Sequence, residues 1–429
     1  MADNIAVTYG RVKNVDLKHI ITLIKKFFFM EEEKAMTSIF RPESKYKAFI
    51  ISLVTFGLSY GLYKAVLDNY LAEIVHMTQF DRGVSEFFRE LPGFLLVFVL
   101  AMLYEFSAEK IFKAGALIML LGMLMQSTVP ANRIWVTSAV FVYSLGEHMQ
   151  FGMRSTLALQ FSQTGRGGAA LGVQNSAYQF GTLAGYIVIA VIFYCLSGKM
   201  NLYRPVFWAS SAIILLGFIF ALKLEGESRP DKHVSRFYFR KKYFKFYMLE
   251  IFYGARKQIF FTFGPYLLVL FYGAGAMAIS ILFALSAIAT FIFSPIIGKI
   301  IDKFGYKIVM VMDTLILVIV CFFYGFAHHF FSMNTAFIVC CVNYILDAVI
   351  SLASMASNVY VQDLSDTPEE VKATISTGVS VNHLITILIA LFGGWIWQVM
   401  GIETLFMLSA AFGLCNSAYA ASIKVPEKK

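Results

Sequence analysis

Ionisable side chains recur at helical spacing inside long apolar stretches of this 429-residue chain. In the stretch 47–75, Tyr60, Lys64 and Asp68 are spaced four residues apart and fall on one face of a helix. A charge inside a membrane-spanning helix costs about 2.5–3.5 kcal/mol on insertion scales, so each needs a partner or a function. A carboxylate held there can take up and release a proton, while an ammonium or guanidinium group can hold an anionic group.

Three further stretches repeat this pattern, and two others add polar residues. The candidate substrate-binding and coupling residues are Tyr60, Lys64 and Asp68; Glu147, His148, Gln150 and Arg154; Gln174 and Tyr178; Glu250, Tyr253, Arg256 and Lys257; Asn343 and Asp347; and Asn382 and His383. In the stretch 333–361 the polar stripe is expected to run on through Ser351, Ser354 and Asn358.

Among the acids, Glu147 and Asp347 are the first candidates for proton coupling because apolar residues flank them, and Asp68 is the third. Lys64, Arg256 and Lys257 are candidates for holding an anionic group on the solute. A purely structural role remains an alternative for several of these residues. Lys64 and Asp68 can simply neutralise each other, and the two histidines, His148 and His383, can be packing residues. Arg154 and Glu250 can belong to gates near the inner membrane surface.

The composition indicates which kind of structure holds these residues. Hydrophobic residues make up 58% of the chain and charged residues 15%, with a mean hydropathy of +0.68. Soluble domains carry about 25% charged residues, so this chain has more apolar surface than a soluble core can bury. The composition excludes an ordinary soluble protein and predicts an all-α polytopic membrane protein.

Twelve apolar stretches are long enough to cross about 30 Å of hydrocarbon. They lie at about 47–75, 87–104, 111–129, 134–153, 168–197, 205–222, 243–271, 274–297, 308–327, 333–361, 374–399 and 402–422. An even number of spans places both termini on one side. With the termini inside, 27 of the 36 Lys and Arg residues fall inside. Five fall outside, Arg82 and Arg89 among them, and Lys47, Lys64, Arg256 and Lys257 remain in the spans. The positive-inside rule therefore predicts cytoplasmic termini.

A long basic connector divides the chain into two nearly equal halves. We expect a basic, amphipathic cytoplasmic segment at 1–46, a six-helix bundle at 47–223, a cytoplasmic linker at 224–242, a second bundle at 243–423 and a tail at 424–429. In the first segment, apolar residues between Val15 and Phe28 recur at helical spacing beside lysines. This pattern is typical of a helix lying on the inner leaflet, and a loosely docked tail is the alternative.

Other chemistry finds little support in the sequence. The five cysteines show no metal-binding spacing. Gly165 to Gly172 is glycine-rich but follows a membrane stretch and lacks a phosphate-binding lysine, so we expect no nucleotide site. The net charge of +9 is explained by membrane orientation rather than by nucleic acid. We therefore expect no enzyme, no metal and no cofactor, with the proton as coupling ion.

One loop carries a recognisable motif. Between the eighth and ninth stretches the chain reads Gly298, Asp302, Lys303, Gly305 and Lys307 at the spacing G-x-x-x-D-R/K-x-G-x-R/K. This resembles the cytoplasmic signature of the major facilitator superfamily. Gly298 is expected to let two helix ends approach, Gly305 to permit a tight turn, and Asp302 to accept hydrogen bonds from a neighbouring helix or basic residue. The matching loop of the first half keeps only a degraded copy over 101–110.

The resemblance implies a fold of two pseudo-symmetric six-helix bundles in which spans 1, 4, 7 and 10 line a central cavity. It also implies secondary transport by alternating access, with the loop motif acting as a gating contact. The charged stretches found above are these same four spans.

We therefore expect a secondary transporter of a small polar or charged organic solute, coupled to protons and embedded as a monomer among lipids of the cell membrane. Equal numbers of embedded acids and bases favour a zwitterionic or anionic solute. The alternatives are a multidrug exporter and a transport-incompetent scaffold, sensor or lipid handler with the same fold.

Overall fold

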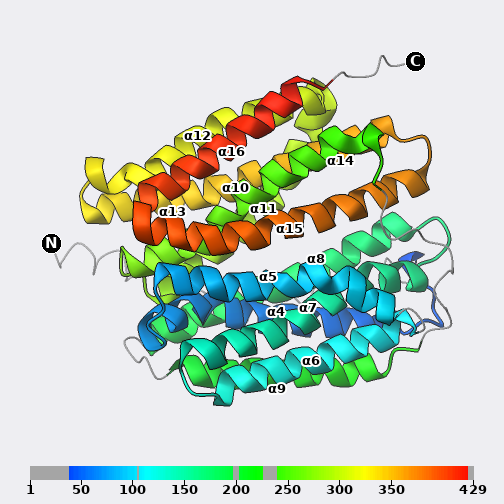
Figure 1. The fold of residues 1–429 in the computed structure, drawn as a ribbon. Helices are drawn as coiled ribbons and strands as arrows, with labels where there is room; N and C mark the ends of the chain where they lie inside the picture. Colours follow the sequence, from blue (N-terminus) through cyan, green and yellow to red (C-terminus); the bar gives the residue numbers. More distant parts are fainter. Residues whose placement is uncertain (1–37, 104–105, 197–201, 226–238, 424–429) are drawn as a thin grey trace, which may run out of the picture.

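The computed structural model describes residues 38–103, 106–196, 202–225 and 239–423, and helices dominate these ranges (Figure 1). Twelve helical paths cross the molecule. They are α4 with its continuing π-helical turn η1 (Tyr46–Asn69, Tyr70–Ile74), α5 (Gln79–Met102), α6 (Ala108–Thr128), α7 (Arg133–Phe161), α8 (Gly167–Cys195), α9 (Tyr203–Leu222), α10 (Phe244–Leu270), α11 (Ala276–Phe304), α12 (Tyr306–Phe330), α13 continued by η4 and α14 (Met333–Ile350, Ser351–Ser354, Met355–Leu364), α15 (Pro368–Met400) and α16 (Ile402–Ala421).

Nine of these paths, within the described ranges, are long and apolar enough to cross a membrane. The other three are α5, α7 and α10. The all-α polytopic fold predicted from the sequence is confirmed, and each of these three helices holds buried ionisable residues.

Local sequence explains where several helices begin. Thr78 and Asp81 form a reciprocal capping box at the start of α5, in which the Thr78 side chain accepts from the Asp81 N–H at 3.2 Å. Gly305 separates α11 from α12 with φ of 81°, a left-handed conformation that favours glycine. The turn predicted at Gly305 is therefore present.

The two halves repeat one packing scheme. In the first, α4 packs against α8 and α9, α6 packs against α7 and α9, and α5 packs against α7. In the second, α10 packs against α15 and α16, α12 packs against α13 and α16, and α11 packs against α13. Each pair in one half has its counterpart six spans later, so the halves form two pseudo-symmetric six-helix bundles, drawn one above the other in Figure 1.

The bundles meet mainly through two helix pairs, α5 with α15 and α8 with α11, and α10 and α11 also contact α4 (Figure 1). We call the end of the molecule where α4 begins and α16 finishes the terminal end, and the opposite end the distal end. Near the distal end, a Cβ on Gly83 of α5 would lie 2.4 Å from the Ala390 carbonyl oxygen of α15. Glycine is therefore needed for this close approach.

Several predicted boundaries are wrong. The second span begins at Gln79 rather than 87, because the capping box starts the helix among its charges, so Arg82 and Arg89 lie within α5 and not in an outside loop. The fourth span runs eight residues further than predicted, which places Arg154 well inside α7. These shifts leave fewer basic residues outside, and the cytoplasmic side of the termini remains a prediction.

The tenth span is broken where a continuous polar stripe was predicted. A 3-10 turn, Ser351–Ser354, interrupts it, and the Tyr253 hydroxyl donates to the Ser351 carbonyl oxygen at 3.1 Å. The predicted amphipathic helix between Val15 and Phe28, the central part of the linker and the tail at 424–429 lie outside the described residues. The domain boundaries therefore stay a prediction.

Candidate functional site

A chain of ion pairs runs from α4 along α5. Asp68 on α4 accepts from Lys64 at 3.4 Å and from Arg82 Nε at 2.9 Å. Arg82 also pairs with Glu86 at 2.7 Å, and Glu86 in turn pairs with Arg89 at 2.6 Å. Opposite charges alternate along the chain, so each buried charge has a neutralising partner. The predicted Lys64–Asp68 pair is present, but it is one link of a longer network.

The network continues into the second bundle. Arg89 also pairs with Glu90, whose Oε2 lies 3.0 Å from His383 Nδ1 on α15. The Thr386 hydroxyl, one turn further along α15, lies 3.3 Å from the same oxygen. Glu86 separately accepts from the Gln258 amide of α10 at 3.1 Å. Charged α5 residues thus connect the bundles across their interface.

The predicted residues of the first bundle divide between the interface and the bundle interior. Tyr60, Lys64 and Glu147 line one small cavity together with Arg89, and Phe261 of α10 closes it from the other bundle. The Lys64 ammonium lies 4.9 Å from the Phe261 ring centroid, a cation–π contact. The cavity therefore contains cations, an acid and aromatic rings from both halves.

The remaining candidates of the first bundle lie further toward the terminal end or away from the interface. The Arg154 guanidinium stacks 3.8 Å from the Tyr178 ring centroid, and Nε and Nη2 of Arg154 have no hydrogen-bond partner within the described residues. Gln174 is also buried on α8. Gln150 lies against Gly115 of α6, inside the first bundle, so the structure does not bring it to the interface.

A second cluster lies inside the second bundle, around Glu250. Its carboxylate accepts from Ser357 at 3.2 Å and from the Asn382 amide at 3.3 Å, and Tyr253 lines the same pocket. Asp313 of α12 lines it as well. Glu250 and Asn382 are 132 residues apart in the chain and form a hydrogen bond. Both were among the residues predicted to line the central cavity.

Arg256 connects this pocket to Asp347. The guanidinium lies 3.4 Å from Asp313 and 3.8 Å from Asp347, and its side chain is 1% exposed. One cation therefore faces two buried carboxylates, and Asp347 Oδ1 has no hydrogen-bond partner among the described residues. Asn343 lies one turn away on α13 and donates to the Val339 carbonyl oxygen at 2.8 Å. Lys257 is exposed and its ammonium lies 6.0 Å from the Tyr253 ring centroid.

The loop motif is not engaged as predicted. Asp302, Lys303 and Gly305 are exposed, and Asp302 forms no hydrogen bond or ion pair with the described residues. Lys307 donates to the Ile423 carbonyl oxygen at 2.9 Å within the second bundle. No atom of the described chain lies within 4 Å of a Cβ placed on Gly298, so the close helix approach expected there is absent. The physical reason is that the helix ends around the motif stand apart in this conformation.

Contacts between the bundles gather from the middle of the molecule to the distal end. Asn69 donates to the Ala274 carbonyl oxygen at 2.7 Å, and the Tyr266 hydroxyl donates to the Met77 carbonyl oxygen at 2.6 Å. Toward the terminal end, a Cβ on Gly172 of α8 would have only open space around it within the described structure. The described contacts between the bundles are therefore concentrated between the middle and the distal end.

One ion pair lies on the surface at the terminal end, where the linker meets the second bundle. Lys242 donates to Asp366 at 2.8 Å, and this hydrogen bond raises the pKa of Lys242. The Asp366 side chain is 87% exposed, so water competes with the pair. It contrasts with the buried network of α5.

Comparison with known proteins shows the family to which the chain belongs. The sequence model of the Major Facilitator Superfamily matches residues 49–367 and, in a second match, 246–429. The chain belongs to the Major Facilitator Superfamily. This is a family of transporters and not of enzymes, so the non-enzymatic nature expected from the sequence is confirmed. The search of curated protein sequences gave no significant match.

Solved structures share the fold at low sequence identity. A mutant of the nucleoside transporter NupG superposes with a TM-score of 0.72 at 16% identity, over 89% of this chain and 100% of that one. A bacterial homologue of the human lysosomal transporter Spinster, inward-facing and unoccupied, gives 0.64 at 12% identity, over 89% and 97%. A POT family transporter with bound 5-aminolevulinic acid gives 0.68 at 11% identity, over 86% and 94%. At these identities the likeness concerns the fold alone.

Sequence reasoning missed the charged residues of α5 and Asp313 of α12. A signal was present for α5: Arg82 and Glu86 are four residues apart, and Glu86 and Arg89 are three apart, which is the spacing of ion pairs on one helix face. No comparable signal pointed to Asp313, because its partner Arg256 lies 57 residues away in the chain.

Proposed function

We propose that this transporter moves a small polar or charged organic solute by alternating access and that protons drive the movement. The observation that carries the proposal is the shared guanidinium of Arg256, which faces Asp313 at 3.4 Å and Asp347 at 3.8 Å. With both acids ionised, this buried trio has one uncompensated negative charge. A single proton neutralises it, and a site that changes between these two states can couple proton movement to a conformational change.

The packing of the bundles supports alternating access. Hydrogen bonds between the halves lie from the middle of the molecule to the distal end, including Asn69 with Ala274. Asp302 of the loop motif forms no hydrogen bond or ion pair with the described residues. If the termini are cytoplasmic, as the positive-inside rule predicts, this conformation is open to the cytoplasm. The opposite conformation would break the distal contacts and engage the motif.

The solute class follows from the groups that face the interface. Lys64 and Arg89 present cations, Glu147 presents a carboxylate, and Tyr60 and Phe261 present rings, all around one cavity. Cations suit a carboxylate or phosphate on the solute, and an acid suits an amine. We propose a zwitterionic or anionic solute, and this mixture of groups does not favour a lipophilic cation as the solute of a multidrug exporter.

The test uses purified protein in liposomes that contain a pH-sensitive dye. Uridine, a dipeptide and 5-aminolevulinic acid are added as probes, because the transporters with similar folds are described as binding or moving such compounds. We expect at least one zwitterionic or anionic probe to accelerate proton entry down an imposed pH gradient. A protein that moves neither protons nor any probe from a wider panel of small polar metabolites would refute the proposal and favour a scaffold.

A further inference from the structure

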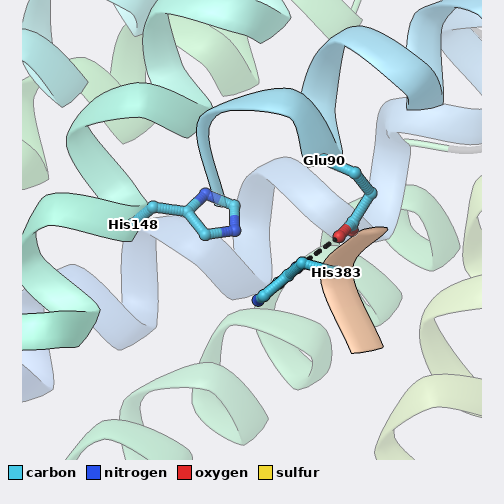
Figure 2. A group of neighbouring side chains, drawn as sticks. All are labelled: Glu90, His148 and His383. Carbon is cyan, nitrogen blue, oxygen red and sulfur yellow. Dashed lines mark hydrogen bonds and ion pairs between the residues drawn. The ribbon is translucent and has the colours of Figure 1, made fainter. Parts of the chain in front are cut away.

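Two histidines and one glutamate converge where α5, α7 and α15 meet at mid-height (Figure 2). Glu90 comes from α5, His148 from α7 and His383 from α15, and one donor atom from each lies within 4.8 Å of those of the other two. Glu90 and His148 are almost completely buried. In a tetrahedral zinc site with bonds of about 2.0–2.1 Å, donor atoms stand about 3.4 Å apart, so small side-chain movements suffice to close the set around an ion.

The hydrogen bonds prepare His148 to act as a ligand. Its Nδ1 lies 2.9 Å from the Ser144 carbonyl oxygen, which can only accept, and 3.0 Å from the Ser144 hydroxyl, which donates its own proton to the Arg89 carbonyl oxygen. Nδ1 therefore carries the proton. The lone pair is therefore on Nε2. A backbone or carboxylate partner on the other ring nitrogen is the usual support of a metal-binding histidine.

The two imidazoles lie close together over the backbone of Gly93. A Cβ on Gly93 of α5 would lie 2.7 Å from His148 Nε2 and 2.9 Å from His383 Nδ1. Any side chain at residue 93 would push the two imidazoles aside, and glycine lets both approach the α5 backbone. Glu90 Oε2 lies 3.0 Å from the same nitrogen of His383, so an ion can take the place of the proton that these two atoms share.

The charges around the cluster do not prevent cation binding. The nearest cation, Arg89, pairs with Glu86 at 2.6 Å as well as with Glu90. Arg82 is held between Glu86 and Asp68. The surrounding charges therefore neutralise one another.

We propose that Glu90, His148 and His383 bind a divalent transition-metal ion of the zinc class, with one coordination position left for water or another ligand. Imidazole and carboxylate are ligands that this class accepts, and three protein ligands with an open position form a known zinc arrangement. His383 belongs to the second bundle and the other two ligands to the first, so the bound ion links the bundles in the conformation described here. This site is additional to the proposed solute and proton sites.

The test measures Zn²⁺ binding to the purified full chain, tagged without histidines, by titration calorimetry. A second His–Glu group, formed by His328, His329 and Glu403 at the distal end, could also bind zinc. The double variant His328→Ala, His329→Ala is therefore the reference protein. We expect it to bind one equivalent of Zn²⁺.

Two variants of the reference protein test the site in different ways. Gly93→Ala adds a methyl group that displaces the two imidazoles but keeps all three ligands, whereas His383→Ala removes the ligand of the second bundle. We expect each to weaken Zn²⁺ binding at least tenfold. Gly172→Ala, at a glycine with open space around it, is the matched control and should bind normally. Zn²⁺ should also raise the melting temperature of the reference protein but not that of His383→Ala.

The proposal is overturned if the reference protein binds no Zn²⁺, or if both variants bind it with unchanged affinity. Should Gly93→Ala fail to fold, Glu90→Gln provides the second variant, because its amide keeps the size of the side chain and removes the anionic ligand. Binding is measured without any solute, so the result is independent of whether transport is observed.

Discussion

Arg82 should be among the residues whose loss destabilises the protein most. Its side chain is 1% exposed, and it pairs with Asp68 at 2.9 Å and Glu86 at 2.7 Å. Removing one partner of a buried ion pair typically costs 3–5 kcal/mol, because an uncompensated charge remains. Here each acid keeps a second cation, since Asp68 retains Lys64 and Glu86 retains Arg89. We therefore expect Arg82→Met to lower the free energy of unfolding by about 3 kcal/mol, the lower end of that range.

The assay is equilibrium unfolding of purified protein in detergent, followed by circular dichroism. A loss of about 3 kcal/mol corresponds to a roughly 150-fold larger unfolding constant. Lys242→Ala removes the surface pairs with Asp366 and Glu370 and is the matched control, expected to change stability by no more than about 1 kcal/mol. The reasoning is refuted if Arg82→Met is as stable as Lys242→Ala, because the buried network would then contribute nothing beyond a surface pair.

Two further predictions concern glycines. Gly83→Ala would place a methyl group 2.4 Å from the Ala390 carbonyl oxygen, so it should separate the distal ends of the bundles. Thr262 of α10 is fully buried, and its hydroxyl accepts from the Gln258 amide at 2.8 Å. In a background with the five native cysteines replaced, Gly83→Ala should increase labelling of Thr262→Cys by an impermeant thiol reagent; unchanged labelling would contradict the assigned contact. Gly305→Ala should destabilise the protein by about 1 kcal/mol or more, because φ is 81° there, whereas Gly298→Ala, with no atom of the described chain near its Cβ position, should cost nothing. The prediction is contradicted if Gly305→Ala and Gly298→Ala have the same melting temperature, because a side chain at residue 305 would then cause no backbone strain.

The architecture was largely predictable, because twelve apolar stretches and one glycine-containing loop are local features of the sequence. The start of α5 was not. Hydropathy treats Arg82, Glu86 and Arg89 as separate costs, whereas in the helix they neutralise one another at i,i+3 and i,i+4 spacing. Averaging over a window cannot register this compensation, so the predicted span began too late and its charges were assigned to a loop.

The candidate site was predicted in part. The Lys64–Asp68 pair was predicted from helical spacing, and the structure contains it. Arg256 and Asp347 were each predicted as site residues, but their contact was not predicted. Gln150 was predicted to lie in the site, but it packs against Gly115 of α6 inside the first bundle. Helical spacing does not tell which of several neighbouring helices one face of a helix contacts. The contact of Glu90 with His383 spans 293 residues and depends on how the two bundles dock, which a single sequence does not encode locally.

The central claim is that a proton on the trio of Arg256, Asp313 and Asp347 drives solute movement. Asp347→Asn makes the trio permanently neutral when Asp313 is ionised, as if the proton were always bound. The decisive measurement compares two modes of transport in liposomes for this variant and the wild type, using the solute found by the dye assay. We predict that Asp347→Asn loses accumulation driven by a pH gradient but retains exchange of labelled for unlabelled solute. Proton-driven accumulation at the wild-type level in Asp347→Asn would contradict the account.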